Sequence, residues 1–171
     1  MSSETILDDT PAPIEAILDQ VTEVLTSGGT LGSLIGYDER DYEAVYTVGH
    51  NHYAQGRYAD ALKAFSFLVM NNPHERRFVN AFASCLQMER QYEEAISFYS
   101  LTSVMDMTDP RPTFHTAECL LALGRMKEAI EALIIVIAQC KTKEQHALKS
   151  RAQALLDILN KPRSAEGRNA K

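Results

Sequence analysis

Several features that are typical of nucleic-acid-binding and membrane proteins are missing from this sequence of 171 residues. Positive charge is not in excess, because 17 lysines and arginines stand against 23 aspartates and glutamates, for a formal net charge of -6. This balance argues against non-specific binding of nucleic acid, which requires a basic face. The longest apolar run, residues 132–138, is too short to span a bilayer, so no insertion into a membrane is expected.

Cysteine is scarce, and its spacing shows no sign of disulfide or metal-binding motifs. The three cysteines, Cys85, Cys119 and Cys140, form no CxxC pair. We interpret them as buried, reduced thiols. The first nine residues are polar and acidic, so no secretory signal is expected there. The sequence therefore predicts a soluble protein of the cytoplasm.

The motifs of common catalytic sites are also absent. No GxSxG, P-loop or GxGxxG motif occurs, and Gly28-Gly-Thr-Leu-Gly32 lacks the strand and the lysine that a phosphate-binding loop needs. His50 and His52 would point about 200° apart on a helix, so they cannot bind one metal ion together. His115 and Glu118 are better spaced, but such pairs are common on helix surfaces. We predict no catalytic residue, no metal site and no cofactor; a metal-dependent enzyme that uses these four side chains is the rival from another functional class.

What the sequence does contain is an internal repeat with a period of 34 residues. One hexapeptide pattern occurs three times, as Gly56-Arg-Tyr-Ala-Asp-Ala61, Arg90-Gln-Tyr-Glu-Glu-Ala95 and Gly124-Arg-Met-Lys-Glu-Ala129. This is the period of the tetratricopeptide repeat, in which each pair of antiparallel helices buries its apolar face by stacking on its neighbours. We predict an all-α fold with three helix–turn–helix repeats at residues 42–75, 76–109 and 110–143.

Small residues at equivalent places in the three repeats have a packing reason. They let the two helices of a pair approach closely, and they are Gly49, Ala83 and Ala117 in the first helices and Ala61, Ala95 and Ala129 in the second. Gly56 and Gly124 fall at the turn between the helices, where glycine readily takes a left-handed conformation. Arg90 replaces this glycine in the middle repeat, which should reduce stability.

Helical patterns flank the repeats on both sides. Apolar residues from Ile14 to Leu25 form a stripe that ends at Gly28, and those from Leu148 to Leu159 form another that stops at Pro162. A short repeat stack needs such terminal helices to cover its ends. We predict a flexible acidic tail at 1–12, an N-terminal helical region at 13–41, a C-terminal capping helix at 144–161 and a flexible tail at 162–171.

The second helix of the third repeat is apolar on nearly all sides, because it includes Leu133-Ile-Ile-Val-Ile137. Neighbouring helices would bury such a surface in a stack, which is the interpretation we favour. A partly exposed face that binds a partner is the alternative.

The first helices of stacked tetratricopeptide repeats line a concave groove, and we predict that this groove binds an extended peptide. Aromatic rings there would hold apolar or proline side chains, and Asn80 and Gln87 would hydrogen-bond the peptide backbone. Tyr53 and Phe114 could instead pack between repeats, and the sequence leaves both possibilities open. The second position of each repeat also faces inward and holds Glu43, Arg77 and Arg111. The predicted groove residues are Tyr46, His50, Tyr53, Asn80, Ser84, Gln87, Phe114, Glu118 and Leu121.

One known groove chemistry is absent. Tetratricopeptide domains that clamp the C-terminal carboxylate of heat-shock chaperones have Lys and Asn at the fifth and ninth positions of the first repeat. This sequence has Tyr46 and His50 there. We therefore expect an internal, apolar segment as the ligand.

Three blocks of the sequence resemble the class II chaperones of bacterial type III secretion systems, the low-calcium-response-H type. They are residues 28–34, GGTLGSL; residues 46–61, which span the first helix pair; and residues 105–121, MDMTDPRPTFHTAECLL. The third block is close to the family pattern MDI-x-(D/E)-PR-x-x-FHAAECLL. General tetratricopeptide repeats do not require these residues, so this block is the most specific, and the likeness covers about residues 20–140.

The resemblance implies that the protein keeps hydrophobic, pore-forming translocator proteins soluble in the bacterial cytoplasm until export, without ATP. In the family an extended translocator segment lies in the groove, and the matching positions here are Tyr46, Tyr53, Ser84, Gln87 and Phe114. The alternatives are a chaperone of the needle subunit and a general tetratricopeptide scaffold.

The resemblance also implies a homodimer of the free chain, because family members often dimerise through their N-terminal helices. The candidate interface residues are Ile14, Ile17, Leu18, Val21, Leu25, Leu31 and Leu34.

Overall fold

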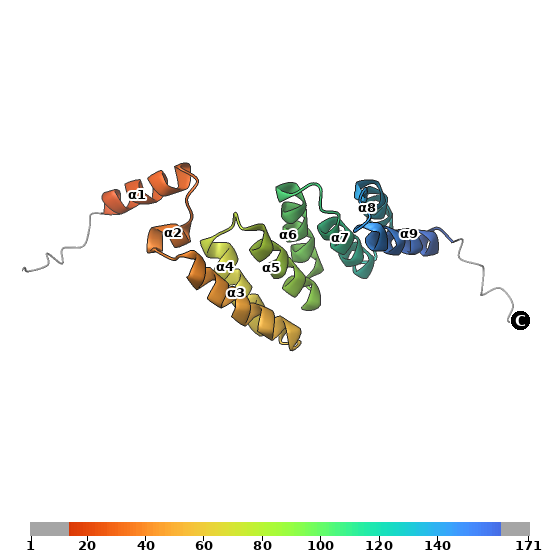
Figure 1. The fold of residues 1–171 in the computed structure, drawn as a ribbon, viewed down its shortest axis with the longest axis horizontal. Coiled ribbons are helices and arrows are strands. Elements are labelled where there is room, and N and C mark those ends of the chain that lie inside the picture. Colours follow the sequence, from red (N-terminus) through yellow and green to blue (C-terminus); the bar gives the residue numbers. More distant parts are fainter. Residues whose placement is uncertain (1–13, 162–171) are drawn as a thin grey trace, which may run out of the picture.

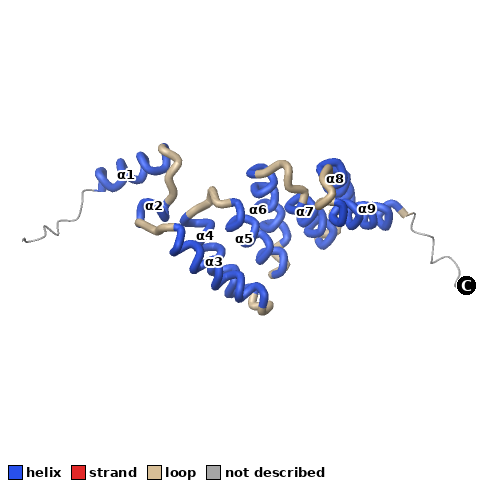
Figure 2. Tube along the Cα trace, in the orientation of Figure 1, coloured by secondary structure: helices blue, strands red, loops and turns tan. Residues whose placement is uncertain are grey.

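The computed structural model describes residues 14–161, and within this range it contains nine helices and no strand (Figures 1 and 2). The prediction of an all-α fold is therefore confirmed. The two tails predicted at 1–12 and 162–171 lie outside the described residues.

The helices form three hairpin pairs with further helices at both ends. In chain order they are α1 (Ile14–Thr26), α2 (Leu31–Ile35), α3 (Glu39–Ala54), α4 (Tyr58–Asn71), α5 (Arg76–Met88), α6 (Tyr92–Met105), α7 (Arg111–Ala122), α8 (Met126–Gln139) and α9 (His146–Asn160). The pairs α3–α4, α5–α6 and α7–α8 stand side by side along the molecule, and α1 and α9 lie at its opposite ends (Figure 1). None of the helices in the described part of the chain has the length and apolar character that crossing a bilayer demands.

Small residues bring the two helices of each pair together, as the sequence predicts. Gly49 on α3 is buried, and a Cβ atom placed there would lie 2.8 Å from Cε1 of Phe65 on α4. Ala61, Ala83 and Ala117 are fully buried at the corresponding places. A larger side chain at any of these positions would force the two helices apart.

The turn inside each pair has the same left-handed backbone. Gly56 has a φ of +74° and Gly124 a φ of +75°, and Arg90 adopts +61° at the equivalent place. Arg90 is the one non-glycine residue with positive φ among residues 14–161. The repeat pattern therefore imposes the turn conformation even where the side chain opposes it.

Each buried cluster of the core joins the two helices of one pair with the helix that follows them. Phe65 of α4 packs in one cluster with Phe78 of α5, and Leu86 of α5 shares another with Cys119 of α7. At the C-terminal end Ala152 of α9 is fully buried against α7 and α8. Each pair thus depends on its neighbours to cover its apolar surface.

Helix α8 is covered on one side and open on the other. Ala129, Leu133 and Val136 are fully buried, whereas Ile134 is 52% exposed and Ile135 50% exposed. Neighbouring helices therefore bury only part of the apolar surface that the sequence shows there, and two isoleucines remain in contact with solvent.

The N-terminal helices project from the first repeat. Thr30 and Ser33 form a capping box at the start of α2, and Gly32 packs so closely on the Tyr42 hydroxyl that no side chain fits there. Helix α1 contacts mainly α2 and stands apart from the repeats (Figure 1). Its residues Ile14 and Leu18 are 76% and 58% exposed.

Replacing Arg90 by glycine should stabilise the protein. The left-handed conformation costs a non-glycine residue about 1–2 kcal/mol, and part of this is offset by the greater freedom of glycine in the unfolded chain. We expect Arg90→Gly to raise the free energy of unfolding by about 0.5–1 kcal/mol in urea titrations followed by circular dichroism. The matched control, Gly124→Ala, should lower it by about 1 kcal/mol. A loss of stability in Arg90→Gly would show that the arginine side chain contributes more than the strain removes.

Candidate peptide-binding groove

A groove of about 530 Å³ crosses the first helices of all three repeats. It is lined from α3, α5 and α7, from the loops that precede α5 and α7, and by one residue of α4. The lining residues are Tyr46, His50, Tyr53, Phe65, Glu75, Arg76, Arg77, Asn80, Ala81, Ser84, Asp109, Arg111 and His115.

The predicted groove residues divide into two sets. Those of α3 and the first half of α5 line the groove, namely Tyr46, His50, Tyr53, Asn80 and Ser84. Those that lie further along the stack do not line it, namely Gln87, Phe114, Glu118 and Leu121. The groove uses the fifth, ninth and twelfth positions of the first repeat but the second and sixth positions of the third repeat, as expected where successive repeats are rotated relative to one another.

An aromatic wall forms the N-terminal end of the groove. The Tyr46 ring lies 5.6 Å from the Phe65 ring and 5.8 Å from the Phe78 ring, between centroids. The Arg77 guanidinium lies 5.4 Å from the centroid of Tyr46 and pairs with Glu43. Rings held in this way offer a rigid apolar surface to a ligand.

Tyr53 lies between the groove and the interior of its own repeat. It lines the groove and also packs edge-on against Tyr58 of α4, with 5.2 Å between the ring centroids. Partial burial raises the pKa of its hydroxyl, so the group stays protonated and can donate a hydrogen bond.

Phe114 belongs to the core. It is only 1% exposed and packs in the cluster that α7, α8 and α9 share, and the guanidinium of Arg151 on α9 lies 4.8 Å from its ring centroid. Leu121 packs against the same cluster. Of the two possibilities for Phe114, packing between elements is therefore the one that the structure shows.

Gln87 and Glu118 are engaged with each other. The Tyr99 hydroxyl donates to Oε1 of Gln87 at 2.7 Å, and Nε2 of Gln87 donates to Oε2 of Glu118 at 3.3 Å. Nδ1 of His115 lies 2.9 Å from the same carboxylate oxygen, and Arg151 lies 3.6 Å from the other oxygen. The Glu118 carboxylate thus joins α5, α7 and α9 beneath the groove.

Glu118 is ionised in this network. Burial alone would raise the pKa of its carboxyl, but the hydrogen bonds from His115 and Gln87 and the charge of Arg151 outweigh this effect and lower it. The carboxylate therefore acts only as a hydrogen-bond acceptor.

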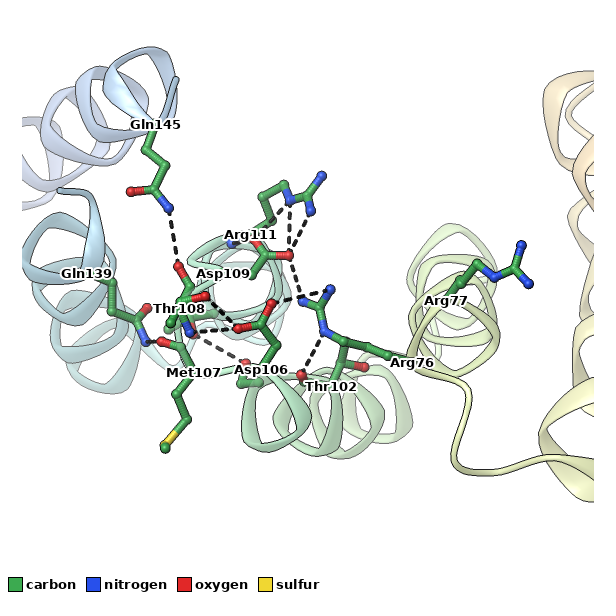
Figure 3. A network of polar contacts seen from close by, with 12 residues as sticks. Arg76, Arg77, Thr102, Asp106, Met107, Thr108, Asp109, Arg111, Gln139 and Gln145 are labelled. Carbon is green, nitrogen blue, oxygen red and sulfur yellow. Dashed lines mark hydrogen bonds and ion pairs between the residues drawn. The ribbon is translucent and has the colours of Figure 1, made fainter. Parts of the chain in front are cut away.

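Asp109 connects the second repeat to the third (Figure 3). Nη2 of Arg76 on α5 donates to its carboxylate at 2.6 Å, and Nε and Nη2 of Arg111 on α7 donate at 2.8 Å each. The Asp109 side chain is only 11% exposed. Burial opposes its ionisation, but the two guanidinium groups outweigh burial and hold the pKa of this carboxyl well below its usual range. We call Arg76, Asp109 and Arg111 the inter-repeat clasp.

The loop before α7 is held from several sides (Figure 3). Oδ1 of Asp106 accepts from the backbone nitrogen of Thr108 at 2.9 Å. Gln139 of α8 donates to the carbonyl of Met107 at 3.4 Å, and Gln145 donates to that of Thr108 at 3.2 Å. Together with the clasp, these bonds give the side chains of Asp106, Asp109 and Arg111 in the most specific sequence block a structural role.

The described residues offer no cluster of three or more His, Cys, Asp or Glu side chains that could hold a metal ion. His50 lines the groove and His52, two residues on, does not. Cys85 and Cys119 are buried, and burial raises the pKa of each thiol to about 12, so neither is reactive near neutral pH.

His115 is one of the lining residues that the sequence does not place in the groove, together with Phe65, Glu75, Arg76, Ala81 and Asp109. It occupies the sixth position of its repeat, next to the predicted fifth position, Phe114. A strict 34-residue period assigns the same lining positions to the first helix of every repeat. It does not show that successive repeats are rotated relative to one another, which changes those positions. The polar residue beside a large apolar one was the available signal, because the apolar side chain belongs in the core.

Comparison with known proteins agrees with this fold. A tetratricopeptide repeat family model matches residues 46–110. The low calcium response locus protein H of Yersinia pestis is 33% identical to this chain over 143 residues, which are 83% of this chain and 85% of that protein. The tetratricopeptide fold predicted from the 34-residue period is thus confirmed.

Two solved structures are also similar. SycD of Yersinia enterocolitica, a type III secretion translocator chaperone solved as an alternative dimer, has 32% identity and a TM-score of 0.67 over 71% of this chain and 93% of SycD. PcrH of Pseudomonas aeruginosa, solved in complex with the chaperone binding region of PopD, has 34% identity and a TM-score of 0.69 over 72% of this chain and 94% of PcrH.

Removing the charge of Asp109 should destabilise the protein in a pH-dependent way. We expect Asp109→Asn to lower the free energy of unfolding by about 2 kcal/mol at pH 7, because two charge-assisted contacts are weakened. Since the folded-state pKa of Asp109 lies below the unfolded value of about 3.9, its contribution is complete above that pH and is lost as the pH falls below it. The difference between wild type and variant should therefore shrink below about pH 4 in urea titrations at several pH values.

Asp60→Asn is the matched control, because Asp60 pairs with Arg57 on the solvent-facing side of α4. A clearly smaller loss is expected there, since exposed ion pairs contribute little. Equal losses in the two variants would show that the inter-repeat clasp is no stronger than a surface pair.

Proposed function

Because the chain belongs to the family of low calcium response locus protein H, we propose that it is a type III secretion chaperone for hydrophobic translocator proteins in the bacterial cytoplasm. The observation that carries the proposal is the groove across α3, α5 and α7, which combines tyrosine rings with uncommitted amide and imidazole groups. SycD is a translocator chaperone, and PcrH binds a chaperone binding region of PopD. The cargo of this chain would be an extended segment of such a translocator.

The chemistry of the groove suits an extended segment. Tyr46 and Tyr53 are partly buried and give apolar contact area at a low entropic cost. An extended chain also presents unpaired N–H and C=O groups, which need partners when they leave water. The side-chain amide of Asn80 forms no hydrogen bond within the described residues, so it is free to serve them.

The charge of the protein supports the same role. A translocator has membrane-inserting stretches that would aggregate in water. A partner with a net charge of -6 and a preformed groove shields one such segment and keeps the complex in solution by charge repulsion. Binding to a preformed groove needs no ATP, and release at the secretion machine remains possible because a small groove gives moderate affinity.

We extend the proposal to a homodimer of the free chain through the N-terminal helices. Apolar side chains there are exposed to an unusual degree, with Ile14 76%, Leu18 58%, Leu31 44%, Leu34 38% and Ile35 63% exposed. Val21 on α1 is half-buried. Several large apolar side chains exposed on two successive helices support an interface there, and SycD has been solved as a dimer.

Tyr53→Ala should weaken binding to a translocator segment by about tenfold or more, because an aromatic anchor in a groove commonly contributes about 2 kcal/mol. Isothermal titration calorimetry with the synthetic chaperone binding region of PopD measures the effect. In co-expression with the hydrophobic proteins encoded beside this chain, the variant should keep less of them soluble than the wild type does.

Val48→Ala is the control, because Val48 lies on the same helix and is 51% exposed but does not line the groove. It should bind like the wild type, and circular dichroism should show equal helicity for both variants. If the wild-type chain binds no translocator peptide and solubilises none of the neighbouring proteins, the proposed function is wrong.

Leu18→Glu should convert the free dimer into a monomer, because it places a charge in the proposed interface. Sedimentation velocity or light scattering at micromolar concentration measures the mass. Ile134→Glu on α8 puts the same charge on another exposed apolar residue and should leave the dimer intact. A wild-type chain that is monomeric throughout this range would contradict the dimer.

A further inference from the structure

His115 presents a hydrogen-bond acceptor to the groove, and its neighbours determine which ring nitrogen carries the proton. Nδ1 lies 2.9 Å from Oε2 of Glu118, which is ionised and can only accept. The hydrogen bond therefore requires the proton on Nδ1. In the neutral ring Nε2 then carries the lone pair.

The ring is held in one orientation by stacking. It lies nearly parallel to the Tyr99 ring, at 22° and 5.2 Å between centroids, and edge-on to Phe114 at 6.0 Å. Tyr99 is fully buried, and its hydroxyl lies 2.7 Å from Gln87, which itself donates to Glu118. Turning the imidazole would therefore break its hydrogen bond to Glu118 and its stacking on Tyr99.

Nε2 has no hydrogen-bond partner within residues 14–161. It is not among the buried unpaired atoms of this range, and His115 lines the groove with 37% of its side chain exposed. The other polar groups that the sequence predicts nearby are already used. Ser84 donates to the carbonyl of Asn80 at 2.9 Å, and Gln87 and Glu118 serve the network. Nε2 of His115, the amide of Asn80 and the hydroxyl of Tyr53 form no hydrogen bond within the described residues, and of these Nε2 is the one that can act only as an acceptor when the ring is protonated at Nδ1.

We propose that His115 binds the cargo by accepting a hydrogen bond from one main-chain N–H of the extended segment at Nε2, and that Glu118 positions it for this role. The proposal rests on the proposed function, because it concerns a ligand in the same groove. A main-chain N–H is the group that every residue except proline offers, so this contact helps to hold segments of different sequence in the same register. The side-chain amide of Asn80 can donate a hydrogen bond to a main-chain carbonyl of the same segment.

The first test removes the acceptor and the donor separately. His115→Phe keeps a ring that can stack on Tyr99 but has no nitrogen, and it should bind the PopD peptide about five to ten times more weakly. A series of peptides in which single amides are replaced by esters removes one N–H at a time. One ester should weaken binding to the wild type by about fivefold and should have no further effect on His115→Phe.

His74→Phe is the matched control, because His74 is exposed and does not line the groove. It should bind every peptide of the series like the wild type. Circular dichroism and the thermal midpoint show whether His115→Phe folds.

The second test uses the wild-type protein, so it does not depend on whether His115→Phe folds. Nitrogen-15 NMR of the free wild-type protein at pH 8, above the ordinary titration range of imidazole, reports the proton position. His115 should be the Nδ1–H form, and Nε2 should shift when the peptide binds. Glu118→Gln, whose amide can also donate, should lower the fraction of this form.

The outcomes separate the two proposals. If the peptide binds the wild type but all esters weaken wild type and His115→Phe equally, or if the free ring is protonated at Nε2, the role of His115 is wrong and the proposed function stands. If no translocator peptide binds the wild type at all, the proposed function fails first.

Discussion

Each helix pair of this protein completes its buried cluster only with residues of the next helix, and the remaining structure depends on that constraint. Phe65 is buried because Phe78 of the next repeat lies against it, and Phe114 because Ala152 of the last helix closes the stack. The first helices therefore stand side by side with their polar and aromatic edges on one surface. A groove is the direct result of the way in which the chain buries its apolar residues, so Tyr46 and Tyr53 both pack against the core and line the groove.

The inter-repeat clasp at Asp109 fixes how the second and third repeats stack on each other. Apolar contacts between repeats permit some sliding, whereas two guanidinium groups on one carboxylate have a fixed geometry. Arg76 and Arg111 come from α5 and α7, so the clasp sets the relation of the two helices that form the C-terminal half of the groove. The most specific sequence block thus contains three functions in order: a clasp, a core residue at Phe114 and a groove residue at His115.

The sequence was sufficient for the fold but only for part of the site. The period of 34 between Gly56, Arg90 and Gly124 predicts the three hairpins, because a repeated turn requires a repeated backbone. It also predicts the lining positions of α3. It could not predict that Phe114 turns into the core and His115 into the groove, since the rotation between repeats and the cover from α9 arise only in the assembled stack. The sequence shows that Gln87 and Glu118 are polar, and only the structure shows that they form a hydrogen bond with each other.

The arginines of the groove already have their counterions. Arg76 and Arg111 share Asp109, Asp106 lies 4.0 Å from Arg76, and Arg77 pairs with Glu43 and Glu75, all from the same chain. A segment that enters the groove therefore displaces few mobile ions, and the complex has little to gain from dilute salt or to lose in concentrated salt. In the complex that we propose, rings and main-chain hydrogen bonds would hold the cargo, and its affinity would change little with ionic strength.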